Sequence, residues 1–255
     1  MIVMTAASFK GGVGKTETVR NLAQSFASHY NLRVLAIDMD PTSMLSIGWG
    51  LSPIETRLTI YHAMRDPEAA HECVVNLRDN LDLLPASPDL SGAESEFARD
   101  PFGQNRKLKN VLRKLSNNYD IALIDTAGDF NFLFVNAVTA STHVLIALES
   151  KWHAYTQLNQ LFEVLTFAQN ENEILQICGI VLTFYDRRVK LTKAIEDKAR
   201  SELGEYVLNT VIPHNVAITE APIRGMSVIE YEPKSAGAQA YRELAKEILQ
   251  RVEEN

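Results

Sequence analysis

A glycine-rich run from Lys10 to Thr16 has the residue types and spacing of a phosphate-binding loop. It follows the apolar run 2–7 and enters a helical-looking segment, 17–30. Glycines let the backbone curl so that N–H groups point at phosphate oxygens, and the helix N-terminus adds its positive dipole end. We expect a P-loop with Lys15 on the β- and γ-phosphates and Thr16 on Mg²⁺. The alternative is a turn without a ligand. The candidate nucleotide-binding residues here are Gly11, Gly12, Val13, Gly14, Lys15, Thr16 and Glu17.

Three aspartates follow two predicted strands. Asp38 and Asp40 come directly after the strand 33–37, and Asp125 follows the strand 120–124. In a doubly wound sheet, ligands bind beyond the carboxyl ends of the strands, and Mg²⁺ takes oxygen ligands. We therefore expect Asp38 and Asp125 to serve the metal and Asp40 to orient the attacking water. Each aspartate taken alone could equally be structural.

The elements that must position these residues alternate along the chain. Buried strands separated by helices specify a parallel sheet with right-handed crossovers. The sequence predicts one α/β domain over residues 1–255, with a mostly parallel twisted sheet and helices on both faces. The expected strands are 2–7, 33–37, 80–84, 120–124, 144–148, 177–183 and 206–212. The expected helices are 17–30, 59–65, 68–74, 103–115, 153–169, 190–203 and 235–253.

Composition narrows the class of protein. The 255 residues are 46% hydrophobic and 22% charged, which is ordinary for a globular domain, and the net charge is −7. Any nucleic-acid surface must therefore be a local patch. Cys73 and Cys178 lie far apart in the sequence and have no metal-site spacing, so we expect buried thiols. No secretory signal or membrane-spanning run is evident, so we expect a cytoplasmic protein.

Lys10 is a second lysine at the start of the loop, and the run KGGVGKT resembles the deviant Walker A box of the ParA/MinD family of P-loop ATPases. Similar segments occur at 38–41, 182–188 and 210–216, so the resemblance covers nearly the whole chain. It implies ATP and Mg²⁺ as cofactors, ATP hydrolysis, and a homodimer in which Lys10 reaches the partner's nucleotide. It also adds Thr183, Pro213 and Asn215 to the nucleotide-binding candidates, the last two at the adenine.

Two segments depart from the family pattern. The family usually continues its DxDP segment with Gln-x-Asn, whereas Thr42, Ser43 and Met44 stand here. The family's IDTPP segment appears as Ile124-Asp125-Thr126-Ala127-Gly128. The usual contacts of these segments are therefore not carried over to this chain.

Lys151 follows the predicted strand 144–148 and stands at a predicted helix start facing the nucleotide site. Helix N-termini disfavour cations, so an ordinary solvated lysine competes with a functional one here. The resemblance adds that carboxysome-distributing ATPases are thought to use a late lysine of this kind across the dimer. Lys10 and Lys151 are therefore both candidate cross-dimer lysines.

Basic residues are concentrated late in the chain, where a helix is predicted. A phosphate-binding stripe would give sequence-independent and salt-sensitive DNA binding, whereas the alternative is a solvated helix face. The candidate nucleic-acid residues are Arg187, Arg188, Lys190, Lys193, Arg200 and Arg224.

Three functions compete. The favoured one is a nucleoid-associated positioning ATPase, whose ATP-bound homodimer binds non-specific DNA and is released when a cargo-linked adaptor stimulates hydrolysis. A carboxysome is the favoured cargo, and a plasmid or chromosome with a ParB-like partner is the other. The second function is a MinD-like membrane switch, which the acidic C-terminal end disfavours. The third is a metabolic or metal-delivery ATPase, which the cysteine count disfavours.

Overall fold

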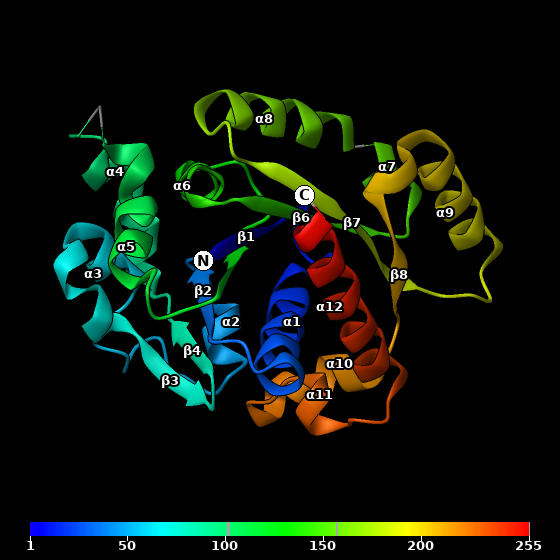
Figure 1. Ribbon diagram of the computed structural model, residues 1–255, viewed down its shortest axis with the longest axis horizontal. Helices are drawn as coiled ribbons and strands as arrows, with labels where there is room; N and C mark the ends of the chain where they lie inside the picture. The colour runs from blue at the N-terminus through cyan, green and yellow to red at the C-terminus, as the bar shows by residue number, and fades with distance from the viewer. Residues whose placement is uncertain (101–102, 157, 255) are drawn as a thin grey trace.

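Strand β1 (Ile2–Ala7) lies inside the sheet, and the glycine-rich loop leaves its carboxyl end. The computed structural model describes residues 1–100, 103–156 and 158–254. Within these ranges eight strands form one sheet in the order β3-β4-β2-β5-β1-β6-β7-β8 (Figure 1). Neighbouring strands are parallel except β3 and β4, which are antiparallel. The remaining strands are β2 (Val34–Met39), β3 (Val75–Arg78), β4 (Leu81–Leu84), β5 (Ile121–Thr126), β6 (His143–Glu149), β7 (Gln176–Tyr185) and β8 (Val207–Pro213).

Alternate residues of the inner strands face two separate parts of the core. Val34 and Ala36 of β2 belong to one buried cluster, whereas Leu35 and Ile37 belong to another. Every residue of β2 and β5 is buried, as expected when helices cover both faces of a parallel sheet. The predicted α/β fold with its mostly parallel sheet is confirmed.

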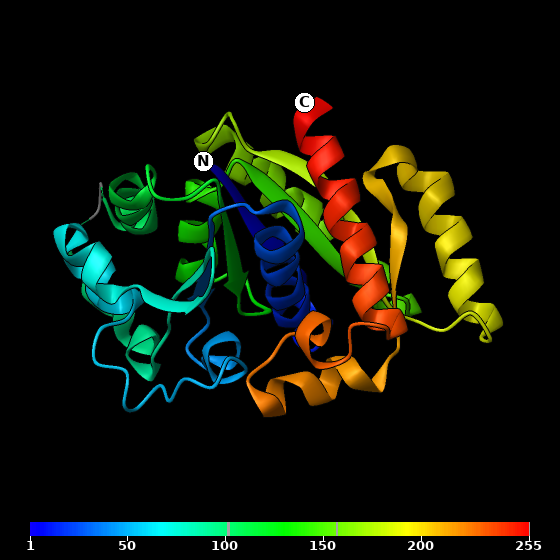
Figure 2. The same ribbon diagram turned by 60° about the horizontal axis from the view of Figure 1, so that its bottom comes forward.

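One face is covered by α1 (Lys15–Tyr30) and α12 (Ala236–Glu254), which Figure 2 shows side by side. Residues of α6 (Phe132–Ala140) and α8 (Leu158–Glu171) contribute to the clusters that hold the other set of strand residues. The other helices are α2 (Met44–Ile47), α3 (Ile60–Arg65), α4 (Ala93–Phe97), α5 (Lys107–Leu115), α7 (Trp152–Thr156), α9 (Lys190–Leu203), α10 (Val216–Glu220) and α11 (Val228–Tyr231).

The structure differs from the predicted elements in several places, and the short helices α2, α4, α10 and α11 were not predicted. The predicted helix 68–74 is a 3₁₀ helix, Pro67–Cys73. The predicted helix 153–169 is divided between α7 and α8, and Gln157 lies outside the described residues. Helix α6 was not predicted, because it is apolar on nearly all sides and shows no helical period. Strand β3 was missed as a short antiparallel edge strand.

Helix α12 buries an apolar stripe that includes Tyr241, Leu244 and Ile248 against β8 and α1. The acidic C-terminal helix therefore docks on the core, as its sequence predicts. Across the described ranges, the structure contains no helix that is long and apolar enough to cross a membrane.

Candidate nucleotide-binding site

The loop between β1 and α1 depends on two glycines in the left-handed region. Gly12 has φ 76° and Gly14 has φ 89°, values that a side chain disfavours. Gly14 is the N-cap of α1, and its carbonyl accepts a hydrogen bond from the Thr18 N–H at 2.9 Å. The loop therefore ends where the unpaired N–H groups and positive dipole end of α1 begin.

Lys15 is buried at the base of this loop, with only 5% of its surface exposed. Its Nζ donates to the Ser8 hydroxyl at 2.9 Å, and that hydroxyl donates to the Lys10 carbonyl at 2.7 Å. Burial lowers the pKa of Lys15, although Asp125 and Asp40 oppose this shift. Among the described residues Lys15 forms no ion pair within 4 Å. A buried ammonium without a paired carboxylate is suited to an anionic ligand.

Asp38 and Asp125 lie opposite each other in the parallel register of β2 and β5, and both are fully buried. Burial raises the pKa of Asp38 to about 6 and, with Asp38 nearby, raises the pKa of Asp125 to about 8. Asp38 accepts hydrogen bonds from the Ser46 N–H at 2.9 Å and hydroxyl at 2.7 Å. Thr16 lies beside Asp125 and favours its charged form, yet neither Asp125 oxygen has a partner in hydrogen-bonding geometry among the described residues.

These two carboxylates fit the outer coordination of Mg²⁺. Two buried acids side by side with two unpartnered oxygens are expensive unless a cation lies nearby. The described residues contain no group of three or more His, Cys, Asp or Glu side chains that could hold a metal by itself. Mg²⁺ commonly binds through few protein oxygens together with water and phosphate, so this donor set is consistent with Mg²⁺ on a nucleotide.

Asp40 lines the cleft in front of the loop and is held by the segment that departs from the family pattern. Its Oδ1 accepts from both the N–H and the hydroxyl of Thr42, each at 2.8 Å. Thr42 therefore fixes the carboxylate chosen for the attacking water.

The cleft has a volume of about 620 Å³. One wall comes from the segment after Asp125, where Gly128 passes so close to the loop that a Cβ on it would lie 2.4 Å from the Gly11 nitrogen. Only glycine fits at this crossing, which accounts for the glycine at position 128 in this chain.

A smaller pocket of about 50 Å³ adjoins the cleft and contains Pro213 and Asn215, the two residues assigned to the adenine. The Asn215 Oδ1 is buried and has no hydrogen-bond partner among the described residues. Thr183 also lines this pocket, and its hydroxyl donates to the Val13 carbonyl at 2.8 Å. Thr183 therefore supports the loop from β7. Phe184 adopts φ 51° beside Gly14, so its backbone is strained at this pocket.

Sequence reasoning missed Arg20, which lines the same cleft and is 1% exposed. Its guanidinium lies 2.6 Å from Glu17, donates to the Met44 carbonyl at 3.0 Å and lies 5.8 Å from the Trp49 ring centre. Burial raises the pKa of Glu17, and the nearby Arg20 guanidinium offsets part of this rise. The three-residue spacing of Glu17 and Arg20 was the available signal.

The two candidate cross-dimer lysines differ in their surroundings. Lys10 is exposed, and its ammonium has no ion-pair or hydrogen-bond partner among the described residues. Lys151 is 71% exposed and its Nζ lies 2.6 Å from Glu149 Oε1. Lys151 is thus paired at the surface, whereas the Lys10 ammonium has no partner among the described residues.

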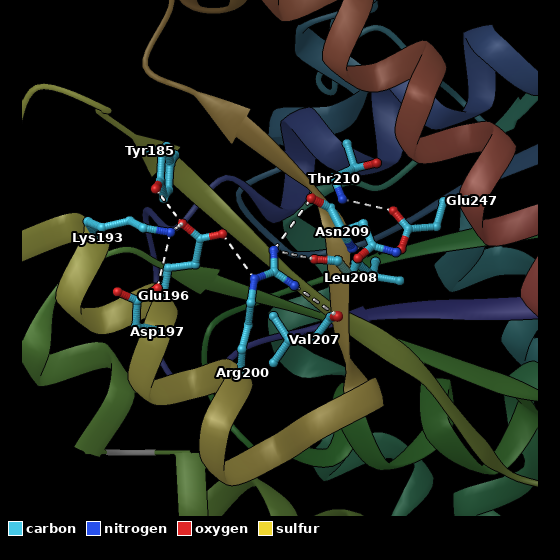
Figure 3. A network of polar contacts seen from close by, with 10 residues as sticks. All are labelled: Tyr185, Lys193, Glu196, Asp197, Arg200, Val207, Leu208, Asn209, Thr210 and Glu247. Atoms are coloured by element: carbon cyan, nitrogen blue, oxygen red, sulfur yellow. Dashed lines mark hydrogen bonds and ion pairs between the residues drawn. The ribbon is translucent and has the colours of Figure 1, made fainter.

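The predicted basic stripe on α9 is partly engaged within the protein (Figure 3). The Arg200 guanidinium lies 2.9 Å from Glu196 and donates to the carbonyls of Val207, Leu208 and Asn209 on β8. Lys193 is 3.0 Å from Asp197 and 3.5 Å from Glu196. We therefore leave Arg200 out of the candidate DNA-binding residues, because its N–H groups are hydrogen-bonded to the carbonyls of β8.

The other basic candidates are exposed. Arg188 forms a two-pronged pair with Asp186, at 2.9 and 2.8 Å. Arg187, Lys190 and Arg224 have no ion pair among the described residues.

Cys73 and Cys178 are buried, unpaired and in different core clusters. Burial raises the pKa of Cys178 to about 12, so its thiol is a poor metal ligand. The structure therefore confirms buried thiols and brings no cysteine pair together.

Two family models match the chain. One, described as an AAA domain, matches residues 1–177. The other, described as 4Fe-4S iron sulfur cluster binding proteins of the NifH/frxC family, matches residues 108–254. Since the two cysteines lie apart, the second match indicates shared architecture rather than an iron–sulfur site in this chain.

Two curated relatives are similar to this chain over nearly its full length. The chain is 37% identical to the chromosome partitioning protein ParA of Caulobacter vibrioides, over 98% of this chain and 94% of the relative. It is 34% identical to the sporulation initiation inhibitor protein Soj of Bacillus subtilis, over 96% and 97%.

Three solved structures share the fold. The cobyrinic acid a,c-diamide synthase of Mycobacterium smegmatis with bound ATP analog and magnesium has TM-score 0.88 and 27% identity, over 99% of this chain and 95% of that one. MinD of Pyrococcus furiosus has TM-score 0.79 and 27% identity, over 98% of each chain. Apo McdA of Cyanothece has TM-score 0.85 at 22% identity, over 98% and 99%, which shows the fold alone. Together with the loop geometry, these matches establish that the chain belongs to the ParA/MinD family of P-loop ATPases.

Proposed function

We propose that this chain is an ATP-hydrolysing positioning switch that works with Mg²⁺ as an ATP-closed homodimer. The observation that carries the proposal is the buried Lys15 facing the in-register carboxylates Asp38 and Asp125. One buried ammonium and two buried carboxylates match the opposite charges of a polyphosphate and its metal. The family membership supplies the ATPase activity.

Each residue at the cleft has a proposed task. Lys15 and the loop N–H groups bind the β- and γ-phosphates, while Thr16, Asp38 and Asp125 hold the metal directly or through water. Mg²⁺ would neutralise charge on the phosphates. Asp40, fixed by Thr42, orients the attacking water. Phosphoryl transfer has a loose transition state, so placement of the acceptor matters more than its basicity.

The mouth of the cleft supports the proposed dimer. Exposed apolar side chains, Met44, Ile47 and Ile223, line it. Exposed Lys10 directly precedes Gly11 and Gly12, which line the cleft, and its ammonium is free to cross to a second copy. A clustered apolar rim with an unpaired cation suits association with another charged, phosphate-bearing face.

We propose that the dimer binds DNA non-specifically through the exposed residues Arg187, Lys190 and Arg224, with Arg188 and Lys193 beside them. Two copies double the number of phosphate contacts, so retention on DNA should depend on ATP and fall steeply with salt. DNA binding of this kind would hold the protein on the nucleoid.

For the cargo, we propose a chromosome or plasmid held through a ParB-like adaptor that stimulates hydrolysis. The relatives at 34–37% identity carry chromosome-partitioning and sporulation names, and they support this choice. The sequence favoured a carboxysome, partly because of Lys151. That argument weakens because Lys151 pairs with Glu149, and because McdA is similar in fold alone.

The deciding experiment measures ATP binding, sedimentation and turnover for Asp40→Ala. We expect ATP affinity and ATP-dependent dimerisation to persist, because the residues that bind the phosphates are intact. Turnover should fall about 100-fold or more, because the attacking water loses the carboxylate that orients it. Unchanged turnover would refute the role of Asp40. Equal DNA retention with and without ATP in the native protein would refute the switch.

A further inference from the structure

An aromatic cluster lies between α7, α8 and α9, away from the P-loop cleft. The rings of Trp152 and Tyr155 are stacked, with centres 6.2 Å apart and planes inclined by 27°. Trp152 is 49% exposed. The two rings line a cleft of about 320 Å³ whose opposite side is formed by Lys198 and Glu202 of α9.

The protein places a cation of its own against these rings. The Lys198 Nζ lies 5.9 Å from the centre of the Trp152 ring and 5.5 Å from that of Tyr155. It also lies 2.5 Å from one oxygen of Glu202, while the Tyr155 hydroxyl donates to the other oxygen. Two aromatic faces and one oriented carboxylate are the set of groups that binds a cation.

Lys198 is a replaceable occupant. Its side chain is 40% exposed, and a lysine on a flexible stem can swing into solvent at little cost. A guanidinium suits this site better than an ammonium, because it is planar, stacks on aromatic rings and is more weakly hydrated. The net charge of −7 adds a general attraction for a basic partner.

We propose that Trp152, Tyr155 and Glu202 form a docking site for an arginine side chain of a partner protein, which displaces Lys198. The site lies outside the P-loop cleft, but one of its lining residues also borders the residues that precede the loop. Leu158, which lines this cleft, also borders a small pocket with Phe9 and Lys10. The docked arginine therefore lies against α7 and α8, whose residues Ala154 and Leu158 line that small pocket with Phe9 and Lys10. This site stands independently of the proposed DNA and cargo functions.

The test is a fluorescence titration with a blocked Gly-Arg-Gly peptide, using the same peptide with citrulline as an uncharged control. The chain has two tryptophans, and Trp49 is 5% exposed, so the response should come from Trp152 and vanish in Trp152→Phe. We expect saturable binding of the arginine peptide and about tenfold weaker binding of the citrulline peptide. Glu202→Gln should weaken binding by a similar factor.

Lys198→Ala is the discriminating variant. If Lys198 is a competitor, its removal tightens peptide binding several-fold, whereas a merely structural Lys198 predicts weaker binding or no change. Equal binding of arginine and citrulline peptides would overturn the proposal. So would an oligothymidine that gives the saturable response when the arginine peptide gives none, since the site would then stack bases. Steady-state ATPase of the native protein, measured separately, tests the proposed function without reference to the peptide.

Discussion

Replacing Arg20 with methionine should cost about 3–5 kcal/mol of the free energy of unfolding, the usual loss when one partner of a buried ion pair is removed. The side chain is 1% exposed and its guanidinium contacts Glu17 at 2.6 Å and the Met44 carbonyl at 3.0 Å. Methionine has a similar length, so it fills most of the space beside Trp49. What it leaves is the Glu17 carboxylate, 23% exposed and with one oxygen buried, without its cation.

The loss should grow with pH. Burial raises the pKa of Glu17, and Arg20 partly offsets that shift. A carboxyl group whose folded pKa exceeds its unfolded value costs nothing while both states are protonated, and destabilises the fold as pH rises from the unfolded pKa through the folded one. Removing Arg20 raises the folded pKa further. The deficit of Arg20→Met should therefore be larger at pH 8 than at pH 5.

Thermal unfolding measures this directly. For a chain of this size 1 kcal/mol shifts Tm by about 2–4 °C, so the expected drop at pH 8 is about 6–20 °C. Arg33→Met is the matched control, because Arg33 pairs with Asp120 at the surface, where water and salt screen the pair. Adding Glu17→Gln to Arg20→Met should recover part of the loss, since the buried charge is gone. A Tm within about 2 °C of the native value at pH 8 would refute the reasoning.

Three further predictions concern the nucleotide site. Lys15→Ala should abolish ATP binding in equilibrium titration with Mg²⁺ present, and near-native affinity would rule out the P-loop assignment, whereas Lys151→Ala should bind ATP normally. Asp125→Asn should lose Mg²⁺-dependent turnover yet raise the Tm of the nucleotide-free protein at pH 8, and the gain should shrink towards pH 5, where the native carboxyl, with its pKa of about 8, is protonated. Lys10→Ala should bind ATP as a monomer in sedimentation with a slowly hydrolysed analogue, because a lysine acting in trans matters only when two copies meet; a monomeric Lys151→Ala would instead give that role to Lys151.

The P-loop and the strand-end aspartates could be predicted because their chemistry is local. A glycine at positive φ, a lysine one residue on and a helix start are contiguous in the chain, and Asp38 and Asp125 end predictable buried strands. Their in-register contact followed from the parallel sheet. What the resemblance could not supply was the support of Asp40 by Thr42, which appears only when the turn is built.

The rest depended on tertiary contacts that no spacing reveals. Helical periodicity grouped Arg200 with the DNA-facing residues, but it cannot tell that the guanidinium turns to the edge of β8. The sequence does not show that Gly128 lies against the loop, where a Cβ on it would be 2.4 Å from the Gly11 nitrogen. Helix α6 was not predicted, because a helix that is buried on nearly every side has no alternation of apolar and polar residues at the helical period.

The nucleotide site contains buried ionisable groups that destabilise the nucleotide-free protein. Asp125 has two buried oxygens without partners, Asp38 lies in register beside it, and the pKa of Lys15 is lowered by its own burial. Among the described residues, the Asp125 carboxyl has no hydrogen-bond partner and the Lys15 ammonium has no carboxylate within 4 Å, yet together with Asp38 they complement a polyphosphate carrying a divalent cation. A ligand that binds only the folded state stabilises it, by about 2.7 kcal/mol at a hundred times its Kd. The same buried charges that lower the stability of the nucleotide-free protein therefore contribute to the affinity for the ligand. This is why the sequence places these carboxylates at inner strand ends, where burial makes the mismatch largest.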